Sequence, residues 1–294
     1  MTTLNSSSKV FLITGASGGA APYVVRTLLA RGDRVVLTAR NADRLAELEH
    51  ELSAGNAVAT VTADVIEPEQ AAMVAARAVE QFGRLDGLVH LAGAFRAGTP
   101  VIAAPPEVYL ELYRANVVAA AVVTQAVLRQ MRTGPGWLVY IGSLLAQEPM
   151  PTTGPYAASK SALLAWVRAL GREVADLGIN ANAVVTTLLD TPKNRATQPD
   201  ADHSRWVPAE DLAEVVDFLT SSGARSMFGM AVPVHGRFAL VPPPGAVGGP
   251  PPGVIAGPPR SAVGGPPPGP VPQQHGRVGV PEAPLAGPPA GPRP

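Results

Sequence analysis

The sequence predicts an α/β fold in which a doubly wound parallel sheet carries helices on both faces. Between residues 8 and 238, short apolar segments rich in β-branched residues alternate with longer segments of helical period. Strands separated by helices at this spacing favour a parallel sheet that is covered on both sides. A glycine-rich stretch, TGASGGAA, joins the first strand to the first helix. In a doubly wound sheet, that turn lies at the edge where nucleotides bind.

The expected strands are short runs dominated by Val, Ile, Leu and Thr, residues that suit a buried sheet. In chain order they occupy residues 10–14, 34–39, 58–63, part of 85–91, 137–141, 179–185 and 230–234.

The expected helices place apolar residues on one face, at helical spacing. In chain order they occupy residues 20–30, 43–52, 68–82, 106–131, 156–177 and 208–220. Gly32 follows the first helix, and Pro68 and Gly83 mark the start and end of the third, as helix boundaries favour. Segment 106–131 is apolar almost all round, which predicts burial on two sides. One side would contact the sheet, and the other either a second subunit or the chain's own loops.

Charge and composition exclude several classes of function. The 23 Lys and Arg residues balance 23 Asp and Glu residues, so nothing points to nucleic acid or to an anionic membrane surface. Cysteine is absent, which fits a reducing compartment. The N-terminal MTTLNSSSK lacks the pattern of a secretory signal, and no apolar run reaches the ~18–20 residues of a membrane span. We therefore expect a cytoplasmic protein without a metal site.

The composition changes after Phe238. Pro, Gly, Ala and Val dominate residues 241–294, and the octet AVGGPPPG occurs twice. Too few large apolar residues are present to offset the entropy of ordering, which predicts a disordered tail with polyproline character. The tail is either a ligand for a domain that binds Pro-rich segments or an extension without a role. One folded domain is thus expected over residues 8–238.

The glycines of the first turn suit the binding of a phosphate group. Gly15, Gly18 and Gly19 allow a tight turn and a close approach of a pyrophosphate, and the helix that follows offers free N–H groups. The spacing differs from the common G-x-G-x-x-G, so the turn alone is weak support for a nucleotide site.

A second motif supplies groups for proton transfer. Tyr156 and Lys160 lie four residues apart, on one face of a predicted helix. A nearby ammonium stabilises phenolate, so Lys160 should lower the pKa of Tyr156 and bring its proton exchange nearer to neutral pH. Ser143 follows the strand at 137–141 and therefore lies at the same sheet edge, where a hydroxyl could hold a substrate oxygen.

Together these motifs resemble the short-chain dehydrogenase/reductase family over residues 8–238. The family's T-G-x-x-x-G-x-G loop is matched by Thr14, Gly15 and Gly19, and its N-A-G segment appears as Leu91-Ala92-Gly93, with Leu91 in place of the Asn. The Asp that follows the family's third strand is matched by Asp64 and its helical Asn by Asn116, while its Ser, Tyr and Lys correspond to Ser143, Tyr156 and Lys160.

The resemblance implies a Rossmann-type fold, an NAD(P) cofactor and hydride transfer between that cofactor and a carbonyl or secondary alcohol. Tyr156 would be the general acid or base, Lys160 would assist it and bind the nicotinamide ribose, and Ser143 would polarise the carbonyl. Asn116 would hold a water of the proton relay, and Thr191 would contact the nicotinamide carboxamide. The implied cofactor-binding set is Thr14, Gly15, Ser17, Gly18, Gly19, Ala20, Arg40, Asp64, Val65, Ala92, Gly93, Tyr156, Lys160, Leu189 and Thr191. Relatives form dimers and tetramers, which implies a homodimer or homotetramer.

The end of the second strand favours NADP over NAD. A carboxylate there would bind the ribose hydroxyls and repel a 2′-phosphate, but the chain has Arg40 instead, and a guanidinium can pair with that phosphate. The alternative is a solvated Arg40 beside Asn41 as a helix cap. The glycine turn itself contains no Lys or Arg.

Several departures from the family pattern leave alternatives open. Ala21 replaces the last glycine of the loop, His90 replaces the usual Asn and is expected to be structural, and Thr186-Thr187 replaces Pro-Gly. The segment from Leu189 to Trp206 resembles the substrate loop of the dihydropteridine reductase branch. A dihydropteridine reductase-like enzyme that uses NAD(P)H is therefore the second hypothesis for the function. Trp206 would either stack on a flat substrate ring or anchor the loop on the core. A low-turnover NAD(P)-binding sensor on the same fold is a further alternative.

Overall fold

The computed structural model describes residues 8–131 and 134–236 of the 294-residue chain. The predicted domain boundary at residue 238 and the predicted tail over residues 241–294 lie outside the described residues. No helix within the described ranges has the length and apolar character that crossing a membrane requires.

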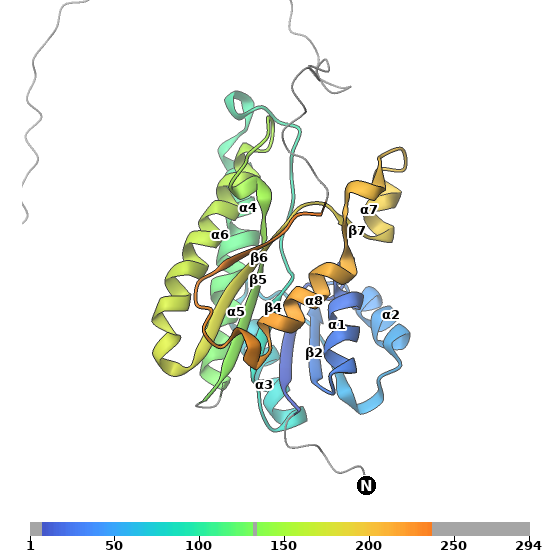
Figure 1. Ribbon diagram of the computed structural model, residues 1–294, viewed down its shortest axis with the longest axis vertical. Coiled ribbons are helices and arrows are strands. Elements are labelled where there is room, and N and C mark those ends of the chain that lie inside the picture. Colours follow the sequence, from blue (N-terminus) through green and yellow to red (C-terminus); the bar gives the residue numbers. More distant parts are fainter. Residues whose placement is uncertain (1–7, 132–133, 237–294) are drawn as a thin grey trace, which may run out of the picture. The chain divides into compact units, whose positions relative to one another are not determined.

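A seven-stranded sheet, parallel at every pairing, forms the centre of the fold (Figure 1). The strand order is β3-β2-β1-β4-β5-β6-β9. The strands are β1 (Val10–Thr14), β2 (Arg34–Ala39), β3 (Val58–Thr62), β4 (Gly87–His90), β5 (Gly136–Ser143), β6 (Ile179–Thr186) and β9 (Ala231–Val234). The predicted doubly wound parallel sheet is confirmed, and its order reverses between β1 and β4.

Helices cover both faces because alternate strand residues point to opposite sides. Phe11 and Ile13 of β1 pack in one apolar core with the helices α1 (Ala21–Ala30), α2 (Ala42–Leu52) and α8 (Ala209–Leu219). Val10 and Leu12 pack in a second core with α3 (Pro68–Phe82), α5 (Ala119–Gln130) and α6 (Gly154–Glu173). Pro68 in the first turn of α3 and Gly83 in the left-handed conformation at its end agree with the predicted boundaries.

The long helix predicted at residues 106–131 is interrupted, contrary to expectation. It consists of α4 (Pro106–Tyr113), a π-helical turn at Arg114–Val118 and α5. Such wide turns insert one residue into the helical repeat and often occur at functional sites. The turn carries Asn116, whose side chain is held by the loop after β4.

The helix predicted at residues 156–177 also differs from the structure at both ends. It begins at Gly154 with Pro155 in its first turn, and its regular part ends at Glu173. A 3₁₀ turn (Ala175–Leu177) follows and stops at Gly178, whose φ of 73° lies in the left-handed region.

Two short strands and a short helix that the sequence pattern did not predict brace the segment after β6. The strand β7 (Leu189–Asp190) pairs in parallel with β8 (Val207–Pro208), and α7 (Pro192–Thr197) lies between them in the chain. Trp206, directly before β8, is buried, and its ring lies against that of His203 with centroids 4.4 Å apart, so it anchors this segment.

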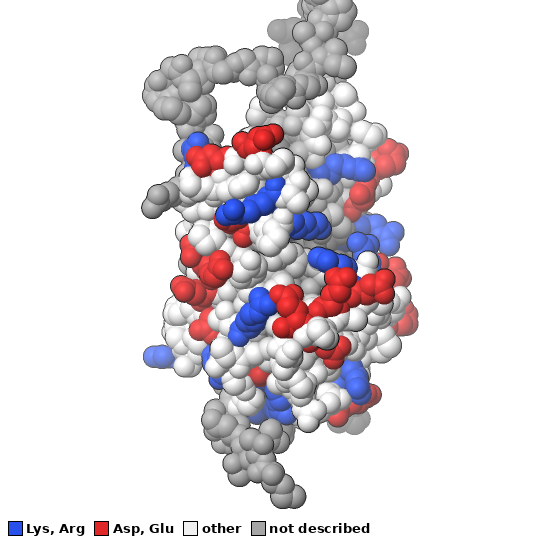
Figure 2. All heavy atoms as spheres, turned by 90° about the vertical axis from the view of Figure 1, so that its right-hand side faces the viewer, with Lys and Arg blue, Asp and Glu red and all other residues white. Residues whose placement is uncertain are grey.

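The charged side chains are mixed on the face shown in Figure 2. Lys and Arg alternate with Asp and Glu there, and neither sign gathers into a large patch. Exposed ion pairs occur in the structure, such as Arg44 with Glu47, 2.8 Å apart. The view agrees with the balanced charge of the sequence.

Candidate active site

The glycine turn after β1 lies against the loop after β4, where the strand order reverses. Thr14 at the end of β1 is in register with both Thr38 of β2 and His90 of β4. Gly15 has a φ of +68°, and a Cβ atom there would lie 2.6 Å from the backbone nitrogen of Ala92. Only glycine satisfies both conditions, because other residues avoid positive φ and their Cβ would collide with that backbone.

A cavity of about 680 Å³ opens at this edge of the sheet. It is lined by most of the residues predicted to bind the cofactor, namely Gly15, Ser17, Gly18, Arg40, Asp64, Val65, Ala92 and Gly93. Thr38 also lines it, and the buried Thr38 hydroxyl has no hydrogen-bond partner among the described residues. The lining thus combines backbone amides, small residues and a few charges, which fits a dinucleotide.

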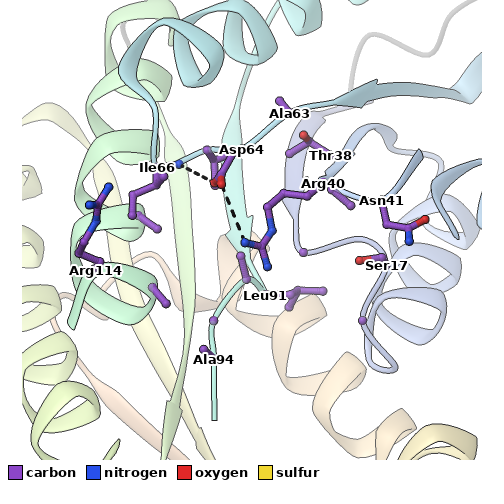
Figure 3. Close-up of a pocket in the computed structure, with 18 of the residues that line it drawn as sticks. Ser17, Thr38, Arg40, Asn41, Ala63, Asp64, Ile66, Leu91, Ala94 and Arg114 are labelled. Carbon is purple, nitrogen blue, oxygen red and sulfur yellow. Dashed lines mark hydrogen bonds and ion pairs between the residues drawn. The ribbon is translucent and has the colours of Figure 1, made fainter. Parts of the chain in front are cut away.

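Arg40 and Asp64 meet at one end of this cavity (Figure 3). The Arg40 guanidinium lies 3.9 Å from the Asp64 carboxylate and is 80% exposed. Asn41 beside it caps α2, because its side chain accepts a hydrogen bond from the backbone N–H of Arg44 at 2.9 Å. Asn41 therefore has the expected capping function, and the Arg40 side chain remains available at the cavity edge.

A second cavity of about 220 Å³ lies between the glycine turn and the segment after β6. Gly15, Gly18, Gly19, Ala20, Leu189 and Thr191 are among its lining residues. A Cβ atom at Gly19 would lie 2.9 Å from the Thr191 hydroxyl oxygen, so the two segments touch. The structure therefore brings the predicted residues Leu189 and Thr191 to the glycine turn. Thr14, by contrast, is fully buried beneath the turn.

Ser143, Tyr156 and Lys160 come together at the same sheet edge. Ser143 is the last residue of β5, and Tyr156 and Lys160 lie one turn apart on the buried face of α6. The Ser143 hydroxyl accepts a hydrogen bond from the Leu145 backbone N–H at 3.2 Å, and it lies near enough to the Tyr156 phenol to influence its pKa. The Lys160 ammonium donates to the carbonyl oxygen of Ile141 at 2.8 Å.

Burial controls the ionisation of these groups. It lowers the pKa of Lys160 to about 8, because a buried ammonium loses its hydration. Burial raises the pKa of Tyr156 above its ordinary value, and the nearby Ser143 hydroxyl opposes this only in part. Loss of hydration sets the net direction of the Tyr156 pKa in this structure, so the expected lowering of that pKa by Lys160 stays a prediction.

Asn116 connects this group to the loop after β4. Its amide nitrogen donates to the Ala94 carbonyl and to the Ser159 hydroxyl, both at 3.0 Å, and its oxygen accepts from the Ala94 backbone N–H at 3.0 Å. A Cβ atom at Gly93 would lie 2.7 Å from the Asn116 oxygen and 3.4 Å from the Lys160 nitrogen. Gly93 therefore joins the large cavity to the Ser143, Tyr156 and Lys160 group. Both amide hydrogens of Asn116 already have protein acceptors, so the predicted relay water could bind only at its oxygen.

His90 is a buried neighbour of the site. Its Nδ1 lies 2.8 Å from the Thr14 hydroxyl, and its Nε2 has no hydrogen-bond partner among the described residues. Burial, and secondarily the charge of Lys160, lower the pKa of His90 to about 3. The ring is therefore neutral near pH 7 and links the ends of β1 and β4, as a structural residue would.

Sequence reasoning missed two residues at the site. Phe95 stacks edge-on against Tyr156, with ring centroids 4.8 Å apart, although its own side chain is largely exposed. Lys193 lines both cavities. Phe95 lies two residues after Gly93, and Lys193 lies two residues after Thr191. This closeness to predicted cofactor-binding residues was the only sequence signal for either side chain.

Two departures from the family pattern, Ala21 and the Thr186-Thr187 pair, fit into the fold through burial and a hydrogen bond. Ala21 is fully buried at the start of α1. The Thr187 hydroxyl donates to the carbonyl of His235 at 3.1 Å, which ties the altered loop after β6 to the residue that follows β9.

Comparisons with known proteins agree with this geometry. The model of the short chain dehydrogenase family matches residues 9–202. The chain is 30% identical over 244 residues to bovine dehydrogenase/reductase SDR family member 4, covering 78% of this chain and 86% of the relative. It is 29% identical over 247 residues to the 3-oxoacyl-acyl-carrier-protein reductase FabG of Escherichia coli, covering 81% of this chain and all of the relative.

A solved structure supports the same assignment. A variant of actinorhodin polyketide ketoreductase, solved with NADPH, superimposes with a TM-score of 0.71 at 29% identity, covering 79% of this chain and 97% of the other. These relatives do not bear on the dihydropteridine reductase likeness, which stays a prediction. The chain belongs to the short-chain dehydrogenase/reductase family and is a ketoreductase-like, NAD(P)-dependent oxidoreductase.

Proposed function

We propose that this enzyme reduces a ketone to a secondary alcohol with NADPH and that Tyr156 supplies the proton. The observation that carries the proposal is the meeting of Ser143, Tyr156 and Lys160 beside Gly93, at the end of a cavity that fits a dinucleotide. The reverse reaction, alcohol oxidation with NADP, uses the same groups.

The residues around both cavities would hold the cofactor. Thr14 sets the turn from below, and the pyrophosphate would lie on the backbone of residues 15–20. Arg40, Asp64 and Val65 would hold the adenosine end, and Ala92 and Gly93 the middle. Leu189, Thr191, Tyr156 and Lys160 would bind the nicotinamide end. The positive φ of Gly15 and the space that a Cβ at Gly93 would fill are features that a close-lying cofactor requires.

NADP is favoured because the end of β2 offers a cation and no carboxylate. Arg40 extends into the cavity, and its partner Asp64 lies at 3.9 Å, an exposed and weak pair that a 2′-phosphate can replace. The actinorhodin ketoreductase structure contains NADPH, which agrees with this choice.

The chemistry divides between the cofactor and the chain. NADPH supplies the hydride that the carbonyl carbon accepts. The Tyr156 hydroxyl donates the proton that the carbonyl oxygen gains, and its raised pKa keeps it protonated near neutral pH, as a general acid must be. Ser143 orients that oxygen by a hydrogen bond. Lys160, held by Ile141, offers a positive charge that stabilises the tyrosinate left behind, until solvent returns the proton.

The substrate class is inferred from the relatives and the site. Two of the relatives named above are reductases of oxoacyl or polyketide substrates, so we propose a ketone as substrate. Trp206 is buried in the segment after β6, so its ring adds no support to the dihydropteridine alternative.

The test is cofactor binding followed by turnover. The protein is titrated with NADPH and NADH by nicotinamide fluorescence, and a panel of ketones, with a quinonoid dihydropterin included, is then assayed for NADPH oxidation. Tyr156→Phe should lose at least about 100-fold in kcat, the ordinary contribution of general acid catalysis. It should still bind NADPH, with a Kd no more than about 5-fold higher, because it loses at most one neutral hydrogen bond to the cofactor. Tyr113→Phe, which removes a half-exposed phenol on α4, is the matched control.

Three outcomes would contradict the proposal. Tight binding without turnover of any ketone supports the sensor alternative. Dihydropterin turnover alone supports the dihydropteridine alternative. Equal activity of Tyr156→Phe and the wild type removes Tyr156 from the mechanism.

We also propose that the chain forms a homodimer or homotetramer. Leu110 and Tyr113 of α4 are 65% and 47% exposed, so the described residues leave part of this helix uncovered. Light scattering of the purified protein measures the mass, and a monomer at assay concentration would contradict the proposal.

A further inference from the structure

Lys193 occupies the place where the two cavities meet. It is the second residue of α7, and it lines both the large cavity and the smaller one. Gly15, Gly18 and Leu91 are shared between the two linings in the same way. A ligand that extends through both cavities therefore passes between the glycine turn and Lys193.

The backbone that carries Lys193 is held in place from both sides. The Thr191 hydroxyl accepts from the Asn194 backbone N–H at 3.2 Å, and the Asn194 amide donates to the Leu189 carbonyl at 2.8 Å. Arg195 forms two hydrogen bonds to Asp190, at 2.5 and 2.7 Å. On the other side, Thr191 touches Gly19 of the glycine turn. The position of Lys193 relative to that turn is thus fixed by contacts and not left to a free loop.

The charges of the large cavity single out Lys193. Three cations line it, and two of them have acidic partners: Arg40 lies 3.9 Å from Asp64, and Arg114 lies 4.0 Å from Glu67. The third acidic lining residue, Glu111, pairs with Arg96 outside the cavity at 2.8 Å. Among the described residues, no carboxylate lies within 4.0 Å of the Lys193 ammonium.

Lys193 is also the charged residue of the smaller cavity, within the part of the chain that the structure describes. Its lining is otherwise glycine, alanine, leucine, threonine and asparagine, so Lys193 is its sole charged member among the described residues. The glycine turn contains no Lys or Arg, and its backbone N–H groups carry only partial charges. A pyrophosphate carries two negative charges, which a lysine ammonium binds as a point charge.

We propose that Lys193 is a further cofactor-binding residue, whose ammonium pairs with the pyrophosphate of NAD(P)H from the side opposite the glycine turn. The proposal rests on the proposed function, because it needs the dinucleotide to bind in these cavities. The pyrophosphate is common to NADH and NADPH, so Lys193 contributes equally to both. Arg40 faces the 2′-phosphate in our account, so it contributes to NADPH alone. The two cations therefore have distinguishable effects.

The experiment measures the Kd of NADPH and of NADH for four proteins, at low and at physiological ionic strength. These are the wild type, Lys193→Gln, Lys193→Arg and the control Arg172→Gln, which removes an exposed charge from the last turn of α6. Melting temperatures confirm that the variants are folded. Lys193→Gln should raise both Kd values by the same factor, about 10-fold at low salt, as expected for one charge-assisted contact. That factor should shrink as salt rises, because screening weakens the wild-type contact.

Lys193→Arg should keep affinity within about 3-fold of the wild type because the charge remains, and Arg172→Gln should match the wild type. Unchanged Kd values for Lys193→Gln would overturn the proposal and leave the proposed function standing. A loss confined to NADPH would overturn it too, since Lys193 would then bind the 2′-phosphate. If the wild type binds neither cofactor, the proposed function fails and this proposal fails with it.

Discussion

Replacement of His90 by Asn should abolish a specific part of the acid sensitivity of this fold. The imidazole is 1% exposed, and burial together with the charge of Lys160 lowers its pKa from 6.5 to about 3. In the unfolded chain the ring takes up a proton as the pH falls through 6.5, whereas the folded chain resists protonation until the pH approaches 3. The stability that neutral His90 contributes is therefore complete above pH 6.5 and is lost progressively below it.

The size of the effect follows from these two values. Each pH unit between them reduces the free energy of unfolding by up to about 1.4 kcal/mol, so a fall from about pH 7.5 to about pH 5 removes about 2 kcal/mol through this group. The figure barely depends on the folded-state pKa, because at pH 5 the buried ring is unprotonated for any value below about 4.

The assay is urea unfolding followed by tryptophan fluorescence at the two pH values. Carboxylates contribute to the acid sensitivity of both proteins, so the difference between wild type and His90→Asn isolates the imidazole. His50→Asn, which removes an exposed histidine from the last turn of α2, is the control and should behave as the wild type. Equal losses of stability in wild type and His90→Asn would contradict this prediction, since the folded protein would then accommodate a charged His90.

Two further predictions concern the glycine turn and the lysine. Gly15→Ala should lower the free energy of unfolding by about 1–3 kcal/mol more than Gly83→Ala, and it should also weaken NADPH binding. Both glycines have positive φ, but of the two only Gly15 has a backbone atom 2.6 Å from the position of the added Cβ. Equal melting temperatures for the two variants would contradict this prediction. For Lys160, whose pKa burial lowers to about 8, kcat/KM for ketone reduction should decline as the pH rises through that value, because the ammonium that stabilises tyrosinate loses its proton. A pH profile that stays flat well beyond pH 8, to about pH 10, would show that the charge is not needed.

Much of the fold could be predicted because local signals and tertiary packing agree. β1, β2 and α3 have the predicted bounds. The two strands are buried runs rich in β-branched residues, and the helix begins at Pro68 and ends before Gly83. The π-helical turn at Asn116 could not be predicted. It is held by hydrogen bonds to Ala94, 22 residues away in the chain, and these exist only once the loop after β4 is in place.

The sequence indicated most of the residues of the site but not the direction in which the pKa of Tyr156 shifts. Spacing places Tyr156 and Lys160 on one face of α6, but the direction of the Tyr156 pKa depends on its burial, which one sequence does not show. Lys193 was missed for a similar reason: its approach to the glycine turn depends on the contact between Gly19 and Thr191, which joins segments far apart in the chain.

The most direct test of ketone reduction by this protein is to follow the hydride from NADPH to the alcohol product. The protein is incubated with a ketone from the active panel and with NADPH that carries deuterium on the reactive face of the nicotinamide, and the alcohol product is examined by mass spectrometry. We expect one deuterium at the carbinol carbon with the wild type and almost none in the same time with Tyr156→Phe. Bound NADPH with no labelled alcohol from any ketone would contradict it and would leave a dinucleotide-binding protein on an oxidoreductase fold.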